Sequence, residues 1–228
     1  MPGKHLKAIF IVCVTVCVAL LATGNLSAQE EAACFDCHEA GDDSPVHAVF
    51  KTVHGSLGGG GTAACTACHG PSEAHNRRGR RNPPDISFGP RWPSDVETRN
   101  GSCLNCHENG DQLLWAGSAH EQENISCDSC HDSHALQDLQ LAKEQAQEQC
   151  LTCHTDVKAQ IHLPSRHPIA EGKTACVDCH NPHGSLGDAA LHQASVNDNC
   201  FSCHQDKRGP FLWEHPPVAE DCALCHRP

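Results

Sequence analysis

Sixteen of the 18 cysteines fall in one five-residue motif, Cys-x-x-Cys-His, which occurs eight times. The other two, Cys13 and Cys17, lie in an apolar segment near the N-terminus, so the motifs leave no cysteine over for a disulfide. The eight copies contain Cys34, Cys37 and His38; Cys65, Cys68 and His69; Cys103, Cys106 and His107; Cys127, Cys130 and His131; Cys150, Cys153 and His154; Cys176, Cys179 and His180; Cys200, Cys203 and His204; and Cys222, Cys225 and His226.

Two thiols at this spacing form thioether bonds with the two vinyl groups of haem, and the adjacent histidine then binds the iron from the proximal side. Zinc also uses Cys-x-x-Cys pairs, and disulfide frameworks are common in exported, cysteine-rich chains. Neither alternative explains why a histidine follows the second cysteine in all eight copies. The sequence therefore predicts an octahaem c-type cytochrome with eight haem c groups as its iron cofactors.

A six-coordinate haem iron needs a second, distal ligand, usually histidine or methionine. The sole methionine is Met1, so the sequence predicts bis-histidine ligation and low reduction potentials. Ten histidines after residue 28 lie outside the motifs and are available to eight irons: His47, His54, His75, His120, His134, His162, His167, His183, His192 and His215.

Sequence context ranks these ten histidines. His134 and His183 follow their motifs at the same offset, and His167 and His215 each precede a proline. We expect these four to be distal ligands.

Three more histidines lie in gaps between motifs that hold few rivals, and we expect them to be ligands as well: His54, His75 and His120. His47, His162 and His192 compete for the last place. We place His47 ahead because the first gap otherwise relies on a single histidine.

The N-terminal segment has the composition of a secretory signal peptide. Lys4 and Lys7 precede an apolar run from Ala8 to Ala22, and small residues precede an expected cleavage site after Ala28. The run is shorter than the roughly 20 residues of a membrane-spanning helix, which disfavours the alternative of an uncleaved anchor. We expect residues 1–28 to be removed and residues 29–228 to form the octahaem domain in the periplasm.

The composition excludes a nucleic-acid binder of the usual basic kind, because the formal net charge is -12 at pH 7.

Aromatic residues are few and tyrosine is absent, so the apolar side chains make only a thin core. Porphyrins must then fill the interior. The expected fold class is a multihaem cytochrome c of mostly short α-helices and loops around an elongated haem chain, with little β-structure.

The motifs start 31, 38, 24, 23, 26, 24 and 22 residues apart, so we expect repeats of about 22–38 residues and a row of neighbouring haems.

Three segments between the motifs have predictable local features. Residues 133–150 contain helix formers without Gly or Pro and are predicted to be one helix. Residues 55–61, "GSLGGGG", are predicted to be a flexible loop. Within residues 75–93, four arginines lie close together in sequence, and they dock on a partner or on haem propionates, or belong to a solvated loop: Arg77, Arg78, Arg80 and Arg81.

Several segments resemble the periplasmic decahaem cytochromes of the MtrA/DmsE type. They are "CVDCHNPHGSL" with the following residues to His226, "FKTVHG", "CTACHGPSEAH" and "SRHPIAEGKTACVDCHNPHG", and "KRGPFLWEHPPV" is the most specific part. The resemblance covers essentially the whole expected mature chain. Relatives of this type carry two further motifs, whereas this sequence ends with "CHRP" after the eighth, as a short natural form or a truncated product.

The resemblance implies electron transfer without substrate chemistry, through a cytochrome inserted in an outer-membrane β-barrel porin. It implies periplasmic or inner-membrane quinol-linked cytochromes as electron donors. It also implies an outer-surface multihaem cytochrome or a reductase as a further partner. Metal respiration, sulfoxide respiration and iron oxidation all fit, because the sequence gives no direction of flow.

Other functions remain as alternatives. A soluble periplasmic shuttle has the same haem chemistry without the porin. A nitrite- or hydroxylamine-type reductase needs an open iron, and the known types rely on a tyrosine or on a lysine in place of the proximal histidine; this chain has no tyrosine and keeps all eight histidines. A membrane-anchored quinol oxidase needs a retained N-terminal helix. We expect no catalytic residues.

Overall fold

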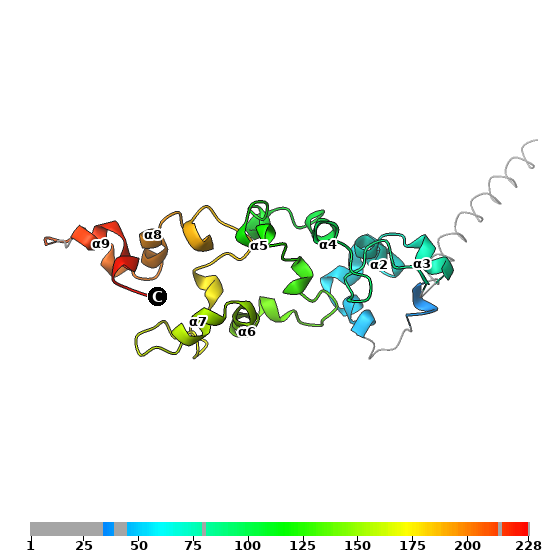
Figure 1. Ribbon diagram of the computed structural model, residues 1–228, viewed down its shortest axis with the longest axis horizontal. Helices are drawn as coiled ribbons and strands as arrows, with labels where there is room; N and C mark the ends of the chain where they lie inside the picture. The colour runs from blue at the N-terminus through cyan, green and yellow to red at the C-terminus, as the bar shows by residue number, and fades with distance from the viewer. Residues whose placement is uncertain (1–33, 39–44, 79–80, 214–215, 228) are drawn as a thin grey trace, which may run out of the picture. The chain divides into compact units, whose positions relative to one another are not determined.

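The chain folds into short helices joined by loops (Figure 1). The structure is a computed structural model, and it describes residues 34–38, 45–78, 81–213 and 216–227. Within these ranges the only β-type pairing is an isolated bridge between His180 and Leu191. The predicted architecture of short helices and loops with little β-structure is confirmed. The expected signal peptide, residues 1–28, lies outside the described residues.

The chain divides into two compact units, which are described separately. Unit 1 comprises Met1–Pro93 and Ser133–Leu136, and unit 2 comprises Ser94–Asp132 and Gln137–Pro228. The described helices of unit 1 are the 3₁₀ helices η1 (Pro45–Lys51) and η2 (Val53–Gly59) and the α-helices α2 (Thr62–His69) and α3 (Glu73–Arg78).

Unit 2 contains α-helices and single 3₁₀ turns in alternation. Its α-helices are α4 (Val96–Leu104), α5 (Ala119–Gln122), α6 (Lys143–Cys153), α7 (Thr155–Gln160), α8 (Val196–Phe201) and α9 (Pro216–Glu220). Its 3₁₀ helices are η4 (Gly110–Gln112), η5 (Cys127–Ser129), η6 (Leu139–Leu141), η7 (Cys176–Asp178), η8 (Asp188–Ala190), η9 (Gln205–Lys207) and η10 (Cys222–Leu224).

Side-chain caps set the start of three α-helices that precede or follow a motif. Asp95, Ser118 and Ser195 cap α4, α5 and α8, and each side chain accepts a hydrogen bond from the backbone N–H three residues later. These bonds satisfy N–H groups that have no partner inside the helix. The caps therefore fix where the short helices begin.

Two local predictions were wrong in detail. The expected helix over residues 133–150 is broken: η6 ends at Leu141, Ala142 is extended, and α6 starts at Lys143. The expected loop over residues 55–61 contains most of η2, although Gly58 has a positive φ of 61° that interrupts it. Tertiary contacts outweigh local propensity in both segments.

The chain builds only a thin apolar core of its own, as predicted. Among the described residues the buried apolar side chains are Val49, Ala64, Trp115, Ala146, Ile161 and Ala175, and three of these are alanines. Large apolar side chains such as Leu212 and Trp213 are almost fully exposed. In the described part of the chain, no helix has the length and apolar character needed to cross a bilayer.

Candidate haem sites

Each motif is wound into a single turn of backbone. In seven motifs the N–H of the histidine donates to the carbonyl of the first cysteine at 2.9–3.0 Å, as in His131 to Cys127, and the remaining motif lies within α2. One α-helical turn spans 3.6 residues, so this bond brings the two thiols and the imidazole together around one turn. All sixteen motif cysteines are free thiols, available for thioether bonds.

The structure brings motif histidines together with histidines from outside the motifs. Five such pairs are described, and each contains one histidine of either kind. The distances between ring centres are 6.3 Å for His38 and His75, 6.2 Å for His69 and His134, 6.0 Å for His131 and His183, 6.1 Å for His154 and His120, and 6.1 Å for His204 and His167.

These separations fit one metal ion between each two rings. A metal–imidazole bond is about 2 Å long and the ring centre lies roughly 1 Å behind the bonding nitrogen, so two imidazoles on opposite sides of one iron have centres about 6 Å apart. Two motif cysteines adjoin every pair, which is the donor set that a covalently attached, bis-histidine haem requires. The residues present therefore fit the group that the motifs imply.

One ring nitrogen is held by a hydrogen bond in several of the paired histidines and in the motif histidine His180. The Nδ1 atoms donate to backbone carbonyls at 2.8–3.0 Å in four cases: His69 to Ile86, His75 to Asn82, His120 to Pro182 and His180 to Ala189. The Nδ1 of His131 donates to the carboxylate of Asp138 instead, at 2.5 Å. A proton on Nδ1 leaves Nε2 with a free lone pair, which is the atom that can bind a metal.

Burial favours the neutral form of two of these imidazoles. Desolvation lowers the pKa of His38, and the nearby His75 lowers it further. Desolvation also lowers the pKa of His183, with a smaller contribution from His131. Since only a neutral imidazole has a lone pair for a metal, both shifts favour ligation.

His47 and His192 are held differently. The Nε2 of His47 donates to the carbonyl of His38 at 2.8 Å, and the Nε2 of His192 donates to the carbonyl of Val177 at 2.9 Å. In both rings the backbone therefore engages Nε2, which is the atom that a proton on Nδ1 leaves available for a metal. Of the other predicted ligands, His54 lies on η2 and His215 lies outside the described residues.

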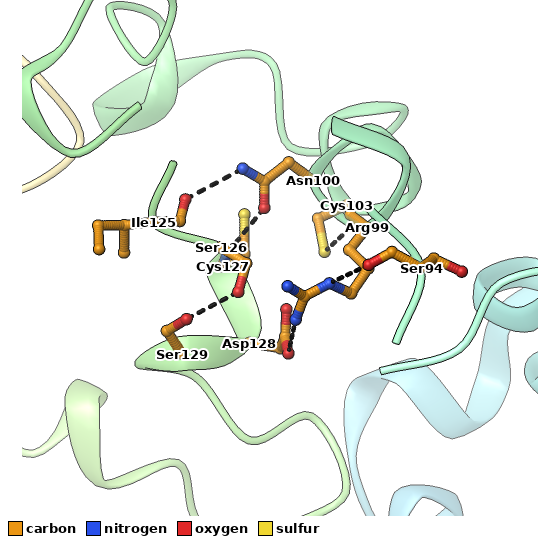
Figure 2. Close-up of polar contacts among 9 residues, drawn as sticks. All are labelled: Ser94, Arg99, Asn100, Cys103, Ile125, Ser126, Cys127, Asp128 and Ser129. Carbon is orange, nitrogen blue, oxygen red and sulfur yellow. Dashed lines mark hydrogen bonds and ion pairs between the residues drawn. The ribbon is translucent and has the colours of Figure 1, made fainter. Parts of the chain in front are cut away.

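An asparagine clamp joins the third motif to the fourth (Figure 2). Asn100 of α4 is 6% exposed; its Oδ1 accepts from the N–H of Cys127 at 2.8 Å, and its Nδ2 donates to the carbonyl of Ile125 at 3.2 Å. An ion pair between Arg99 and Asp128, with N and O 2.6 Å apart, lies beside this clamp. Two neighbouring residues of one helix therefore both hold the following motif.

A second asparagine repeats this arrangement between the seventh and eighth motifs. Asn197 of α8 accepts from the N–H of Cys222 at 2.7 Å and donates to the carbonyl of Ala219 at 3.5 Å. Both asparagines stand three residues before the first cysteine of their own motif. Sequence reasoning missed them, although this shared position was a signal that could have revealed them.

The clamped motifs bring their first cysteines into contact. A hydrogen bond with Cys127 lowers the pKa of the Cys103 thiol to about 7, and raises that of Cys127. The same holds between the fifth and sixth motifs, where a hydrogen bond with Cys150 lowers the pKa of Cys176 to about 6. In each pair one sulfur donates to the other.

The seventh and eighth motifs show the same contact, since the thiol of Cys222 adds to the desolvation that raises the pKa of Cys200. First cysteines thus meet between motifs three and four, five and six, and seven and eight. In each of these pairs the first motif ends an α-helix or lies in its last turn, and the second begins a 3₁₀ helix. The attachment points of successive sites are therefore held side by side within unit 2.

Comparison with known proteins gives consistent matches. Residues 65–142 match the family described as cytochrome c-type protein NrfB-like, and residues 167–209 match the family described as doubled CXXCH motif. Multiheme cytochrome MtrA of Shewanella baltica (strain OS185) is 41% identical over 204 residues, which is 88% of this chain and 60% of the relative. The chain thus spans about three fifths of the length of that protein. These matches agree with the predicted resemblance, and the chain is a multihaem c-type cytochrome similar to MtrA.

Proposed function

We propose that this chain holds eight haem c groups, most of them between two histidines, and passes electrons along them without chemistry on a substrate of its own. The observation that carries the proposal is the set of five histidine pairs, each joining a motif histidine to a histidine 34 to 65 residues away. Haem iron supplies reversible one-electron exchange when it is bound. The polypeptide supplies the axial ligands, the attachment points and the spacing.

The pairs support a proposed distal ligand for each of five motifs. His75 serves the first motif, His134 the second, His183 the fourth, His120 the fifth and His167 the seventh. Three motif histidines do not belong to these pairs, namely His107, His180 and His226. The predicted ligands His54 and His215 would each serve one of these three motifs. The hydrogen bond from Nε2 of His47 to the backbone favours a role in holding the first motif over the ligand role predicted from sequence.

The contacts between cysteines support transfer between successive sites. The first cysteines meet between motifs three and four, five and six, and seven and eight. The second cysteines of neighbouring motifs also lie near one another: besides desolvation, Cys153 of motif five raises the pKa of Cys130 of motif four, and Cys203 of motif seven raises the pKa of Cys179 of motif six. Motifs three to eight are thus linked in sequence order within unit 2.

We place the protein in the periplasm, as the cytochrome of a conduit formed with an outer-membrane porin. Its donors would be periplasmic or inner-membrane quinol-linked cytochromes, and its far-side partner an outer-surface multihaem cytochrome or reductase. The support is the similarity to MtrA and the family resemblance of the sequence motifs. A soluble periplasmic shuttle differs only in lacking the porin.

Two measurements on the purified holoprotein test the proposal. Mass spectrometry should give the mass of the processed chain plus eight haems, and absorption and EPR spectra should show mainly low-spin, six-coordinate iron. A majority of high-spin iron would contradict bis-histidine ligation.

Capture of the tagged protein from detergent-solubilised outer membranes then tests the conduit. Recovery of a porin supports the conduit. Recovery of the holoprotein alone, after cross-linking in intact cells, supports the shuttle instead.

A further inference from the structure

The proximal histidine of the fourth motif is held by a carboxylate. The Nδ1 of His131 donates to Oδ2 of Asp138 at 2.5 Å, and the other oxygen of Asp138, Oδ1, accepts from the N–H of Gln140 at 3.0 Å. Asp138 is also the residue that caps η6. Both carboxylate oxygens are therefore used, and the group is fixed against the imidazole by the backbone that follows it.

The other described Nδ1 bonds of ligand histidines lead to backbone carbonyls. This holds for the proximal residues His69 and His180 and for the distal residues His75 and His120. A carboxylate is a charged and stronger acceptor than a carbonyl, and it draws the Nδ1 proton further from the ring. The imidazole then becomes a more basic ligand and donates more charge to its metal.

The site shields this carboxylate from solvent. The side chain of Asp138 is 17% exposed and that of His131 is 36% exposed. On the far side of the site, the Nδ1 of His183 is buried, and its ring lies 6.0 Å from that of His131. A negative charge in such surroundings is weakly screened, so it acts strongly on a metal held between the two rings.

We propose that Asp138 lowers the reduction potential of the iron held by His131 and His183 below the potentials of the irons whose histidines donate to backbone carbonyls. Extra ligand charge stabilises Fe(III) relative to Fe(II), so this iron is the last of that group to accept an electron. The inference rests on the proposed bis-histidine ligation. It adds one feature to that ligation: electron transfer to the iron of the fourth motif from an iron of higher potential is thermodynamically unfavourable.

The position of the fourth motif makes this step important. Its first cysteine, Cys127, contacts Cys103 of the third motif, and its second cysteine, Cys130, lies near Cys153 of the fifth. Electrons that move between the third and fifth sites along this path pass through the fourth. Asp138 therefore controls transfer through unit 2 without touching the metal.

The substitution Asp138→Asn tests the role of the charge. Asparagine has nearly the same shape, and its single oxygen can accept from Nδ1 of His131, although its NH2 group then replaces the oxygen that accepted from the N–H of Gln140. The motif cysteines and both histidines of the site are unchanged, so the site should assemble. We expect one iron to shift by about tenfold in its Fe(III)/Fe(II) ratio at a given potential, which is an increase of ~59 mV for a one-electron couple. A spectroelectrochemical titration of the holoprotein measures the shift.

Asp95→Asn is the matched control. Asp95 also caps a helix through its side chain, but its described partners are the N–H and hydroxyl of Thr98. The control removes the same charge and should leave all the potentials unchanged. An equal shift in both variants would show a general effect of net charge and would overturn the proposal, as would an unchanged potential in Asp138→Asn with all haems low-spin.

A second measurement needs no substitution. The rings of His131 and His183 are inclined by 19°, which is the smallest angle of the five described pairs. Those of the first and seventh sites are inclined by 31° and 43°, and those of the second and fifth sites by 79° and 63°. Near-parallel imidazoles give a rhombic low-spin EPR signal, and near-perpendicular ones give a strongly axial signal. In an EPR-monitored reductive titration, a rhombic signal should disappear last. Its disappearance before the axial signals would overturn the role of Asp138, whereas mainly high-spin spectra would instead refute the proposed ligation.

Discussion

Among the histidines outside the motifs that have a described ring hydrogen bond, the paired ones donate through Nδ1 and the others through Nε2. In the paired residues His75 and His120 a backbone carbonyl takes the Nδ1 proton, and the ring faces a motif histidine through its other side. In His192 the Nε2 proton is used instead. The same residue type thus has two roles, and the position of one backbone carbonyl decides between them.

Replacing His120 by alanine should convert one iron to the high-spin form. The substitution removes the ring that faces His154 at 6.1 Å, and the iron held by His154 loses its sixth ligand. We expect about one eighth of the haem to change spin state, measured by EPR and by the absorption bands of the oxidised protein, because one of eight motifs is affected.

The matched control is His192→Ala. Its Nε2 donates to the carbonyl of Val177, so its removal should leave every iron low-spin. High-spin haem in the His192 variant, or none in the His120 variant, would show that the ring pairs are not axial pairs.

At the scale of the elements, the contacts between motifs are made by groups that stand next to the cysteines. Asn100 of α4 satisfies two backbone groups of the segment that leads into η5, and Asn197 of α8 does the same before η10. The segment after the fourth motif is also fixed by a contact with that motif. Asp138 bonds His131 and caps η6, which shortens the helix expected over residues 133–150.

Replacing Asn100 by alanine should destabilise the holoprotein by about 1–3 kcal/mol, because the N–H of Cys127 and the carbonyl of Ile125 lose their partner in a buried place. Denaturant unfolding followed by circular dichroism measures the loss. Asn197→Ala should give a smaller effect, because Asn197 is only half-buried.

Asn76→Ala is the control for this series. The amide of Asn76 is exposed and donates to the carbonyl of Pro71 at 3.3 Å, so its removal should change stability little. If Asn100→Ala were no more destabilising than this variant, the clamp would not contribute to the cohesion of the motifs.

At the scale of the whole molecule, the polypeptide has little interior of its own. Its buried apolar residues in the described ranges are few and mostly small, and large apolar groups such as Leu186 and Leu212 are exposed. The loss of chain entropy on folding is of order 1–2 kcal/mol per residue, so burial of this kind cannot balance it. Covalently attached porphyrins must contribute much of the interior.

The chain without haem should therefore be unfolded. We expect expression without haem attachment to give a product with little helical circular dichroism, no cooperative thermal transition and rapid proteolysis. The same chain produced with haem attachment provides the reference. A cooperatively folded apoprotein would contradict the view that the haems form the core.

The sequence by itself determined the chemistry of attachment, because the two thiols and the proximal imidazole lie within five consecutive residues and one backbone turn brings them together. It also determined that the core would be thin, since composition limits how much apolar surface can be buried. The general class of the protein followed from these two features and agrees with the similarity to MtrA.

Only the tertiary structure decided which distal histidine meets which motif. The paired residues are 34 to 65 positions apart, and several gaps contain two candidates of the same type. For His75 and His120 the ring is oriented by a backbone carbonyl that takes the Nδ1 proton, that of Asn82 and that of Pro182. Spacing along the chain predicts a bond that forms within one turn, but not the orientation of a ring that is fixed by residues brought near it by folding.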